Sequence, residues 1–133
     1  MRIFLDTNVL VSAAVFGGCC AELLSRGQDR CEFLVSEVVW REFDEKLSAK
    51  FAFSDEDRAA ARSAFDDFTT VPGGDTGGLA VRDPDDVVIL AAAISAGADI
   101  LATGDGDLLV LEKVGALEIL TPRQLLDRLA GAE

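Results

Sequence analysis

The chain contains no histidine and only three cysteines among its 133 residues. The absence of histidine excludes Ser-His-Asp triads, Cys-His pairs, histidine-based cleavage of RNA and histidine-containing zinc sites. The cysteines, Cys19, Cys20 and Cys31, are too few for a zinc site with four cysteine ligands. Any metal chemistry in this chain must therefore rely on oxygen ligands.

Basic residues are also scarce: 12 lysines and arginines stand against 24 aspartates and glutamates, and the net charge is −12. Such a charge disfavours adhesion to membranes and long-range attraction of nucleic acid. A polyanionic substrate would need a local basic patch, bound cations or a helper protein.

Long apolar runs are lacking, since no segment approaches the roughly 18 residues that a membrane span requires. The first residues reach Asp6 almost at once and do not resemble a signal peptide. We therefore expect a cytoplasmic protein with reduced thiols and no membrane partner. The hydrophobic fraction of 50% is high for a small chain, which favours a homodimer that covers apolar surface.

The length predicts a single domain over residues 1–133. Short apolar segments typical of strands occur at residues 2–5, 32–35, 100–103 and 117–120, and residues 69–71 form a marginal strand. They alternate with helical stretches, a pattern typical of an α/β fold with a mostly parallel sheet covered on both faces. We expect about four to five strands, and a Gly-rich loop at residues 72–78.

The segment 83–94 predicts a buried helix with an acidic entrance. Asp83 followed by Pro84 is typical of an N-cap and a first helical residue. Asp85 and Asp86 then fall in the first turn, where the helix dipole favours negative charge. Apolar residues on all faces behind them indicate burial. The entrance thus carries more acid than capping requires.

Other acids are predicted to lie close to this entrance. Asp6 follows the first strand directly, and Asp105 comes two residues after Thr103 at the end of another strand. The carboxyl ends of parallel strands share one edge of a sheet, where ligands bind in such folds. The acids from these separate segments are therefore expected to converge.

A further acid is expected on the helix that begins after Ser36. Val39, Phe43 and Leu47 form its apolar stripe, and Glu42 flanks that stripe. A carboxylate turned toward the interior needs a partner, so Glu42 is a candidate site acid.

Each acid also has a structural interpretation. Asp6 can also be explained as an ordinary turn residue after a strand. Asp86 can also be explained as a side chain that helps to cap the helix. Asp107 is a possible cap for the next short helix, which makes Asp105 the better site candidate. Glu42 has the alternative of an edge residue whose carboxylate reaches solvent.

Clustered carboxylates raise one another's pKa unless a cation compensates their charge. Because only oxygen ligands are available, Mg²⁺ or Mn²⁺ suits such a site. A cation held by acids in this way points to phosphate or phosphodiester chemistry.

Four motifs together resemble the PIN domain family, in particular the PIN-type (VapC-like) toxins of toxin–antitoxin modules. They are Asp6-Thr7-Asn8, the Glu42 helix, the segment 82–86 and the segment 103–108, and they occur in the family's order and spacing from Met1 to about Arg123. The resemblance implies a three-layer α/β/α fold, metal-dependent cleavage of RNA and an antitoxin partner. One departure is Val87, where many members carry Asn or Asp.

The resemblance also implies roles for individual residues. The family's site acids map onto Asp6, Glu42, Asp86 and Asp105, of which Asp6, Asp86 and Asp105 would hold the metal. Supporting polar residues map onto Asn8, Ser36, Thr103 and Asp107.

The hypothesis is an endoribonuclease in which an activated water attacks the phosphorus and leaves 5′-phosphate and 3′-hydroxyl ends. Arg82 is the best candidate for a phosphate contact, with an ordinary ion pair as its alternative, and Arg41, Lys46 and Lys50 offer further positive charge.

Two rival functions stay open. One is a PIN-fold module that binds RNA or protein without cutting it. The other is a small-molecule phosphatase, which usually needs a lysine in the site, and among the lysines only Lys113 is a possible strand-end residue.

Overall fold

The structure, a computed structural model of the chain, describes residues 1–79, 81 and 83–131. Arg82, the predicted phosphate contact, lies outside the described residues. The described part forms a six-stranded sheet in the order β3-β2-β1-β4-β6-β5. The strands are β1 (Arg2–Leu5), β2 (Glu32–Ser36), β3 (Thr69–Val71), β4 (Ile100–Ala102), β5 (Lys113–Val114) and β6 (Leu117–Leu120).

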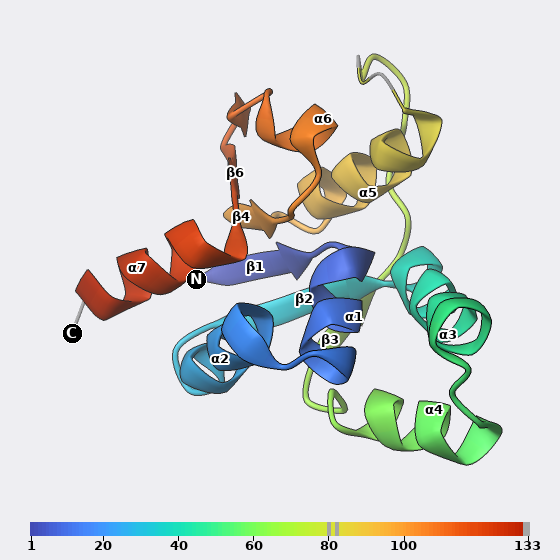
Figure 1. Cartoon of the computed structure of the whole chain (residues 1–133). Coiled ribbons are helices and arrows are strands. Elements are labelled where there is room, and N and C mark those ends of the chain that lie inside the picture. The colour runs from blue at the N-terminus through green and yellow to red at the C-terminus, as the bar shows by residue number, and fades with distance from the viewer. Residues whose placement is uncertain (80, 82, 132–133) are drawn as a thin grey trace.

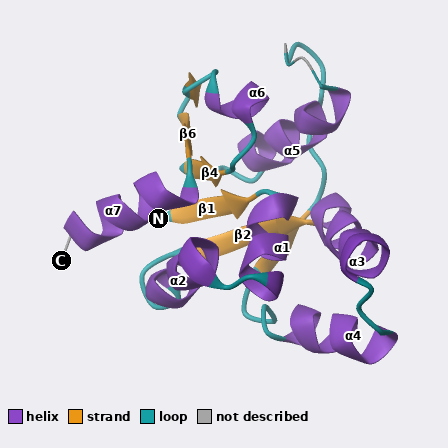
Figure 2. Cartoon of the chain, viewed as in Figure 1, coloured by secondary structure: helices purple, strands orange, loops and turns teal. Residues whose placement is uncertain are grey.

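All neighbouring strands pair in parallel except β5, which runs antiparallel to β6. The helices are α1 (Thr7–Val15), α2 (Gly18–Gly27), α3 (Glu37–Phe51), α4 (Asp55–Ser63), α5 (Pro84–Ser95), α6 (Gly106–Leu109) and α7 (Pro122–Gly131). Figures 1 and 2 show helices on both sides of the sheet, with α1, α2 and α7 on one side and α5 and α6 on the other. The expected three-layer α/β/α fold with a mostly parallel sheet is therefore confirmed.

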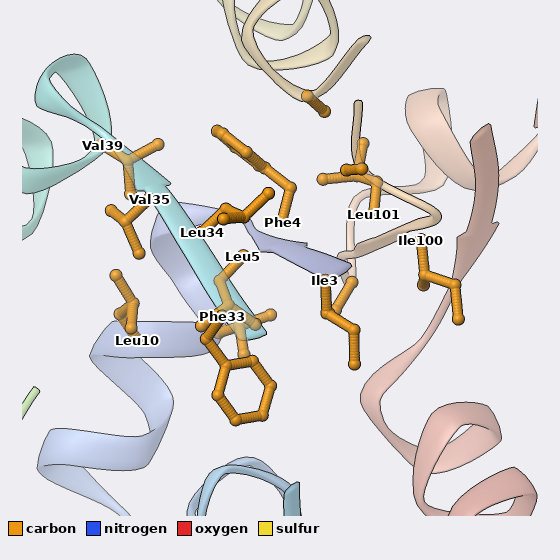
Figure 3. Packing of buried hydrophobic residues seen from close by; sticks show 14 of the residues in the cluster. Ile3, Phe4, Leu5, Leu10, Phe33, Leu34, Val35, Val39, Ile100 and Leu101 are labelled. Atoms are coloured by element: carbon orange, nitrogen blue, oxygen red, sulfur yellow. The ribbon is translucent and has the colours of Figure 1, made fainter. Parts of the chain in front are cut away.

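Alternate residues of the central strands point into the two apolar layers. In Figure 3, Phe4 lies on the side of the sheet that faces α5, whereas Ile3 and Phe33 lie on the opposite side. All three are buried. Because β1 and β2 are covered on both faces, their buried stretches, residues 3–5 and 33–35, are apolar at every position instead of alternating with polar residues.

The chain order creates a switch point beside β1. From β1 the chain passes outward to β2 and β3, and it then returns to place β4 on the other side of β1. Connections that leave in opposite directions from two adjacent strands open a crevice at their carboxyl ends. Asp6 follows β1 and Thr103 follows β4, so both lie at this crevice.

The local signals for helix starts are confirmed. Ser36 accepts a hydrogen bond from the Val39 amide at the start of α3, and Asp83 accepts one from the Asp85 amide at the start of α5. Residues 72–78 contain no helix or strand, as expected. Gly74 of this loop lies against α5, where a Cβ atom would stand 2.2 Å from the Ala91 carbonyl oxygen.

Three expectations need correction. The sheet has six strands instead of four or five, because Gly115, with a φ of 59°, lets Lys113–Val114 fold back on β6. The buried helix is not buried on every face, since Ile94 is 40% exposed. Lys113 is not at the site edge: it pairs with Glu118, which lies beside the first residue of β4.

Among the described residues, no single helix is long and apolar enough to cross a membrane. Only α1 and α2 taken together reach the required length and composition, and their axes differ by 103°.

Candidate metal centre and active site

The predicted acids line one pocket at the carboxyl ends of β1 and β4. The pocket has a volume of about 150 Å³ and is lined by Asp6, Asn8, Glu42, Lys46, Asp83, Asp85, Asp86, Ile89 and Asp105. All four candidate site acids are among these residues. Segments that are far apart in the sequence therefore converge as the strand order predicts.

Asp6 and Asp105 are joined through Thr103. The Thr103 hydroxyl donates to Asp6 Oδ2 over 2.7 Å and accepts from the Asp105 amide over 3.0 Å. The Asp6 amide in turn donates to the Ala102 carbonyl, which fixes the end of β1 to β4. Thr103 is fully buried, so its hydroxyl sets the position of both acids. These contacts place Thr103 between the two acids, and its supporting role stays a prediction.

Burial raises the pKa of Asp6 above its ordinary value. The hydrogen bond from Thr103 opposes this rise by stabilising the carboxylate, while the charge of Asp105 adds to it. The positive charge of Lys46 also acts to lower the pKa.

Asp86, in the first turn of α5, is the most perturbed acid of the pocket. It is 7% exposed, and among the described residues its Oδ2 is the one buried side-chain oxygen or nitrogen without a hydrogen-bond partner. Burial and, after it, the nearby carboxyl groups of Asp105, Asp83 and Asp6 together raise the pKa of Asp86 to about 7. The oxygen therefore lies among acids with no donor to satisfy it, which is costly unless a proton or a cation binds there.

Asp107 lies closer to this centre than the sequence suggested. Ligand oxygens of Asp86, Asp105 and Asp107 all lie within 4.8 Å of one another. The expectation that Asp107 caps the following helix is wrong: Asp105 is the N-cap of α6, and its Oδ1 accepts from the Asp107 amide over 2.8 Å. Asp105 thereby caps the helix and faces the pocket at once, so the two roles were not exclusive.

On the α3 side, two polar side chains of the pocket form hydrogen bonds with residues of α1. The Thr7 hydroxyl donates to Glu42 Oε2 over 2.9 Å, and Lys46 Nζ donates to Asn8 Oδ1 over 2.9 Å. Glu42 is half-buried beside the apolar stripe of α3, as the sequence predicts. Asn8 also lines the pocket, and its side-chain oxygen accepts the hydrogen bond from Lys46.

Ser36 does not line the pocket. Its buried side chain caps α3, so within the described residues its contribution is to the orientation of the helix that carries Glu42. The sequence indicated Lys46 as a source of positive charge near the site, whereas the contact of Thr7 with Glu42 was not foreseen. Their spacing offers a signal in retrospect: Thr7 adjoins Asp6, and Lys46 lies one helical turn after Glu42.

The arrangement fits a hard divalent cation. The ligand atoms are carboxylate oxygens, one of them is buried without a partner, and the sequence supplies no histidine to compete. Mg²⁺ and Mn²⁺ take such ligands, and Mg²⁺ usually keeps several waters beside a few carboxylates. Asp86, Asp105 and Asp107 are the residues best placed to share a cation, with Asp6 at the same pocket.

An acidic pocket at the switch point of a parallel α/β sheet lies where such folds bind their ligands. The sequence model of one family, described as PIN domain, matches residues 2–107. The chain therefore belongs to the PIN domain family. A comparison with curated proteins finds no match.

Solved structures with the same fold are distant in sequence. One is the structure of VapBC2 from Rickettsia felis bound to a DNA fragment from the VapBC2 promoter. It contains a chain with a TM-score of 0.68 and 16% identity, and the match covers 91% of this chain and 98% of that chain. The structure of VapBC-1 from nontypeable Haemophilus influenzae contains a chain with a TM-score of 0.65 and 12% identity. The match covers 92% of this chain and 99% of that chain. The PIN domain endonuclease Utp24 has a TM-score of 0.52 and 22% identity. The match covers 90% of this chain and 84% of that chain. These likenesses show the fold.

Proposed function

We propose that the protein is a metal-dependent endoribonuclease and the toxin component of a toxin–antitoxin module. The observation that carries the proposal is the buried Asp86 Oδ2, which has no hydrogen-bond partner and faces other carboxylates in a pocket at the switch point. Membership in the PIN domain family and the likeness to Utp24, a PIN domain endonuclease, support nuclease chemistry.

In this proposal Asp6, Asp86 and Asp105 hold Mg²⁺ or Mn²⁺, and Asp107 is added to them because its oxygen lies within 4.8 Å of those of Asp86 and Asp105. The cation supplies Lewis-acid activation of water and neutralises charge that develops on the phosphate. Glu42 completes the cluster, held in place by the Thr7 hydroxyl.

The remaining polar residues position these acids. Thr103 fixes Asp6 against Asp105, and Ser36 fixes the start of the helix that carries Glu42. Because a water is the attacking group, the 2′-hydroxyl of RNA is not needed for the reaction. Arg82 remains our candidate for a contact with the phosphate backbone.

An antitoxin partner is proposed because two of the similar structures are of VapBC and the motifs resemble VapC-like toxins. We further propose a homodimer and a cytoplasmic location. The exposed apolar side chains of Phe16, Val110 and Ile94 are compatible with a covering partner.

The test is cleavage of a mixed pool of single-stranded RNAs with Mn²⁺, Mg²⁺ or EDTA. The proposal predicts products with either cation and none with EDTA. Asp6→Asn is expected to abolish cleavage while keeping the fold. Tight RNA binding without products under all conditions would instead support the non-cutting module, which the charge of −12 does not favour.

A further inference from the structure

Lys46 places a positive charge in a pocket that is otherwise lined mainly by acids. It lies on α3 one turn after Glu42, and its Nζ donates to Asn8 Oδ1 over 2.9 Å. Of the lysines and arginines within residues 1–79, 81 and 83–131, it is the only one that lines this pocket. Its charge acts on the site, because it opposes the rise in the pKa of Asp6.

The hydrogen-bond partner of Lys46 is a neutral side chain. In the part of the chain that the structure describes, no carboxylate lies within 4.0 Å of its ammonium, although six acids line the same pocket. Asn8 is neutral, so its hydrogen bond holds the ammonium without cancelling the charge. An ammonium has three donors, and Asn8 uses one of them.

Several other basic side chains form ion pairs away from the pocket. Arg58 pairs with Asp44 and Asp55, and Arg128 pairs with Glu118. In a protein with a charge of −12, a phosphate that approaches the pocket needs a local positive charge to contact. Lys46 is therefore the described side chain best placed to offer such a charge at the pocket itself.

We propose that Lys46 binds a non-bridging oxygen of the RNA phosphate that enters the acidic pocket, with Asn8 holding its ammonium toward that phosphate. This inference rests on the proposed ribonuclease function. Lysine binds phosphate as a point charge, and a charge-assisted contact of this kind is stronger than one between neutral groups. Lys46 would thus be a substrate-binding residue that is separate from the metal ligands.

The experiment compares Lys46→Ala with Lys113→Ala in the full chain. Lys113 is a matched control, because the same charge is removed at the amino end of the parallel strands, away from the pocket. The probe is a fluorescently labelled single-stranded RNA of mixed sequence, with Ca²⁺ as the oxygen-liganded cation. Fluorescence anisotropy at several salt concentrations gives Kd and its salt dependence.

We expect Lys46→Ala to weaken RNA binding by about tenfold, as befits one lost charge-assisted contact. The slope of log affinity against log salt should fall by about 0.7, the value for one phosphate contact on a single strand. Lys113→Ala should change neither quantity, and Lys46→Arg should keep most of the affinity. In cleavage assays Lys46→Ala should raise KM more than it lowers kcat.

A second readout separates substrate binding from support of the acids. The Mn²⁺ affinity of Lys46→Ala, taken from thermal shifts, should stay the same or increase, because a positive charge has left the acidic pocket. A parallel loss of Mn²⁺ affinity would overturn the inference and assign Lys46 to organising the pocket.

Wild-type-like RNA binding and salt dependence in Lys46→Ala would also overturn it, while leaving the ribonuclease proposal intact. Failure of the wild-type protein itself to bind or cut RNA would overturn the proposed function and this inference together.

Discussion

Replacing Asp86 by asparagine should stabilise the metal-free protein, and by more at high pH than at low pH. The folded protein raises the pKa of Asp86 from 3.8 to about 7. Between these values the folded state still holds a proton that the unfolded state has released, so the free energy of unfolding falls as the pH rises. The full difference between the two pKa values corresponds to a loss of about 4 kcal/mol in the free energy of unfolding.

The penalty is only partly present in acid. Integrated between the two pKa values, the penalty is about 2 kcal/mol near pH 5 and about 4 kcal/mol near pH 8, a growth of roughly 2–3 kcal/mol. Asn has no charge to desolvate, so the free energy of unfolding of Asp86→Asn lacks this dependence on pH. It loses a few tenths of a kcal/mol from the helix dipole at the start of α5.

The assay is urea unfolding in EDTA at about pH 5 and about pH 8, for the wild type, Asp86→Asn and Asp85→Asn. Asp85 is a matched control, because it lies in the same first turn but is exposed. We expect the advantage of Asp86→Asn over the wild type to grow by about 2–3 kcal/mol between the two conditions. An advantage that does not change with pH, or a less stable Asp86→Asn at high pH, would refute the reasoning.

Three other outcomes are expected. Mn²⁺ should stabilise the wild type by about 2.7 kcal/mol at a hundredfold excess over Kd, measured as a rise in Tm, and an unchanged Tm up to millimolar Mn²⁺ would count against the site. Thr103→Val removes the hydroxyl that bridges Asp6 and the Asp105 amide, so chemical denaturation should show a loss of about 1–3 kcal/mol, whereas a neutral effect would argue against the bridge. RNA products should carry 5′-phosphate ends by mass spectrometry, and 2′,3′-cyclic phosphates would contradict attack by water.

The sequence predicts the convergence of the acids because the rule behind it is topological. Asp6 and Asp105 follow strands that pair in parallel, and Asp83 begins a helix whose capping signals are local. Such signals depend on a few neighbouring residues, and they survive folding unchanged. The site edge could therefore be placed without coordinates.

What could not be predicted depends on contacts between distant segments. The sequence spacing does not reveal that Lys46 reaches Asn8, because the two lie 38 residues apart on different helices. The closeness of Asp107 to Asp86 likewise depends on how the short helix α6 sits beside α5. The extra strand β5 has only two residues, too few for a periodic pattern.

The most direct test of the central claim is a crystal structure of the protein with Mn²⁺, analysed by anomalous scattering. Our account predicts an anomalous peak in the acidic pocket, in contact with carboxylate oxygens of Asp86 and Asp105. The peak should be absent from crystals of Asp86→Asn grown in the same way. A wild-type pocket without a peak, or a peak bound only elsewhere on the acidic surface, would contradict the claim that these acids form a metal centre.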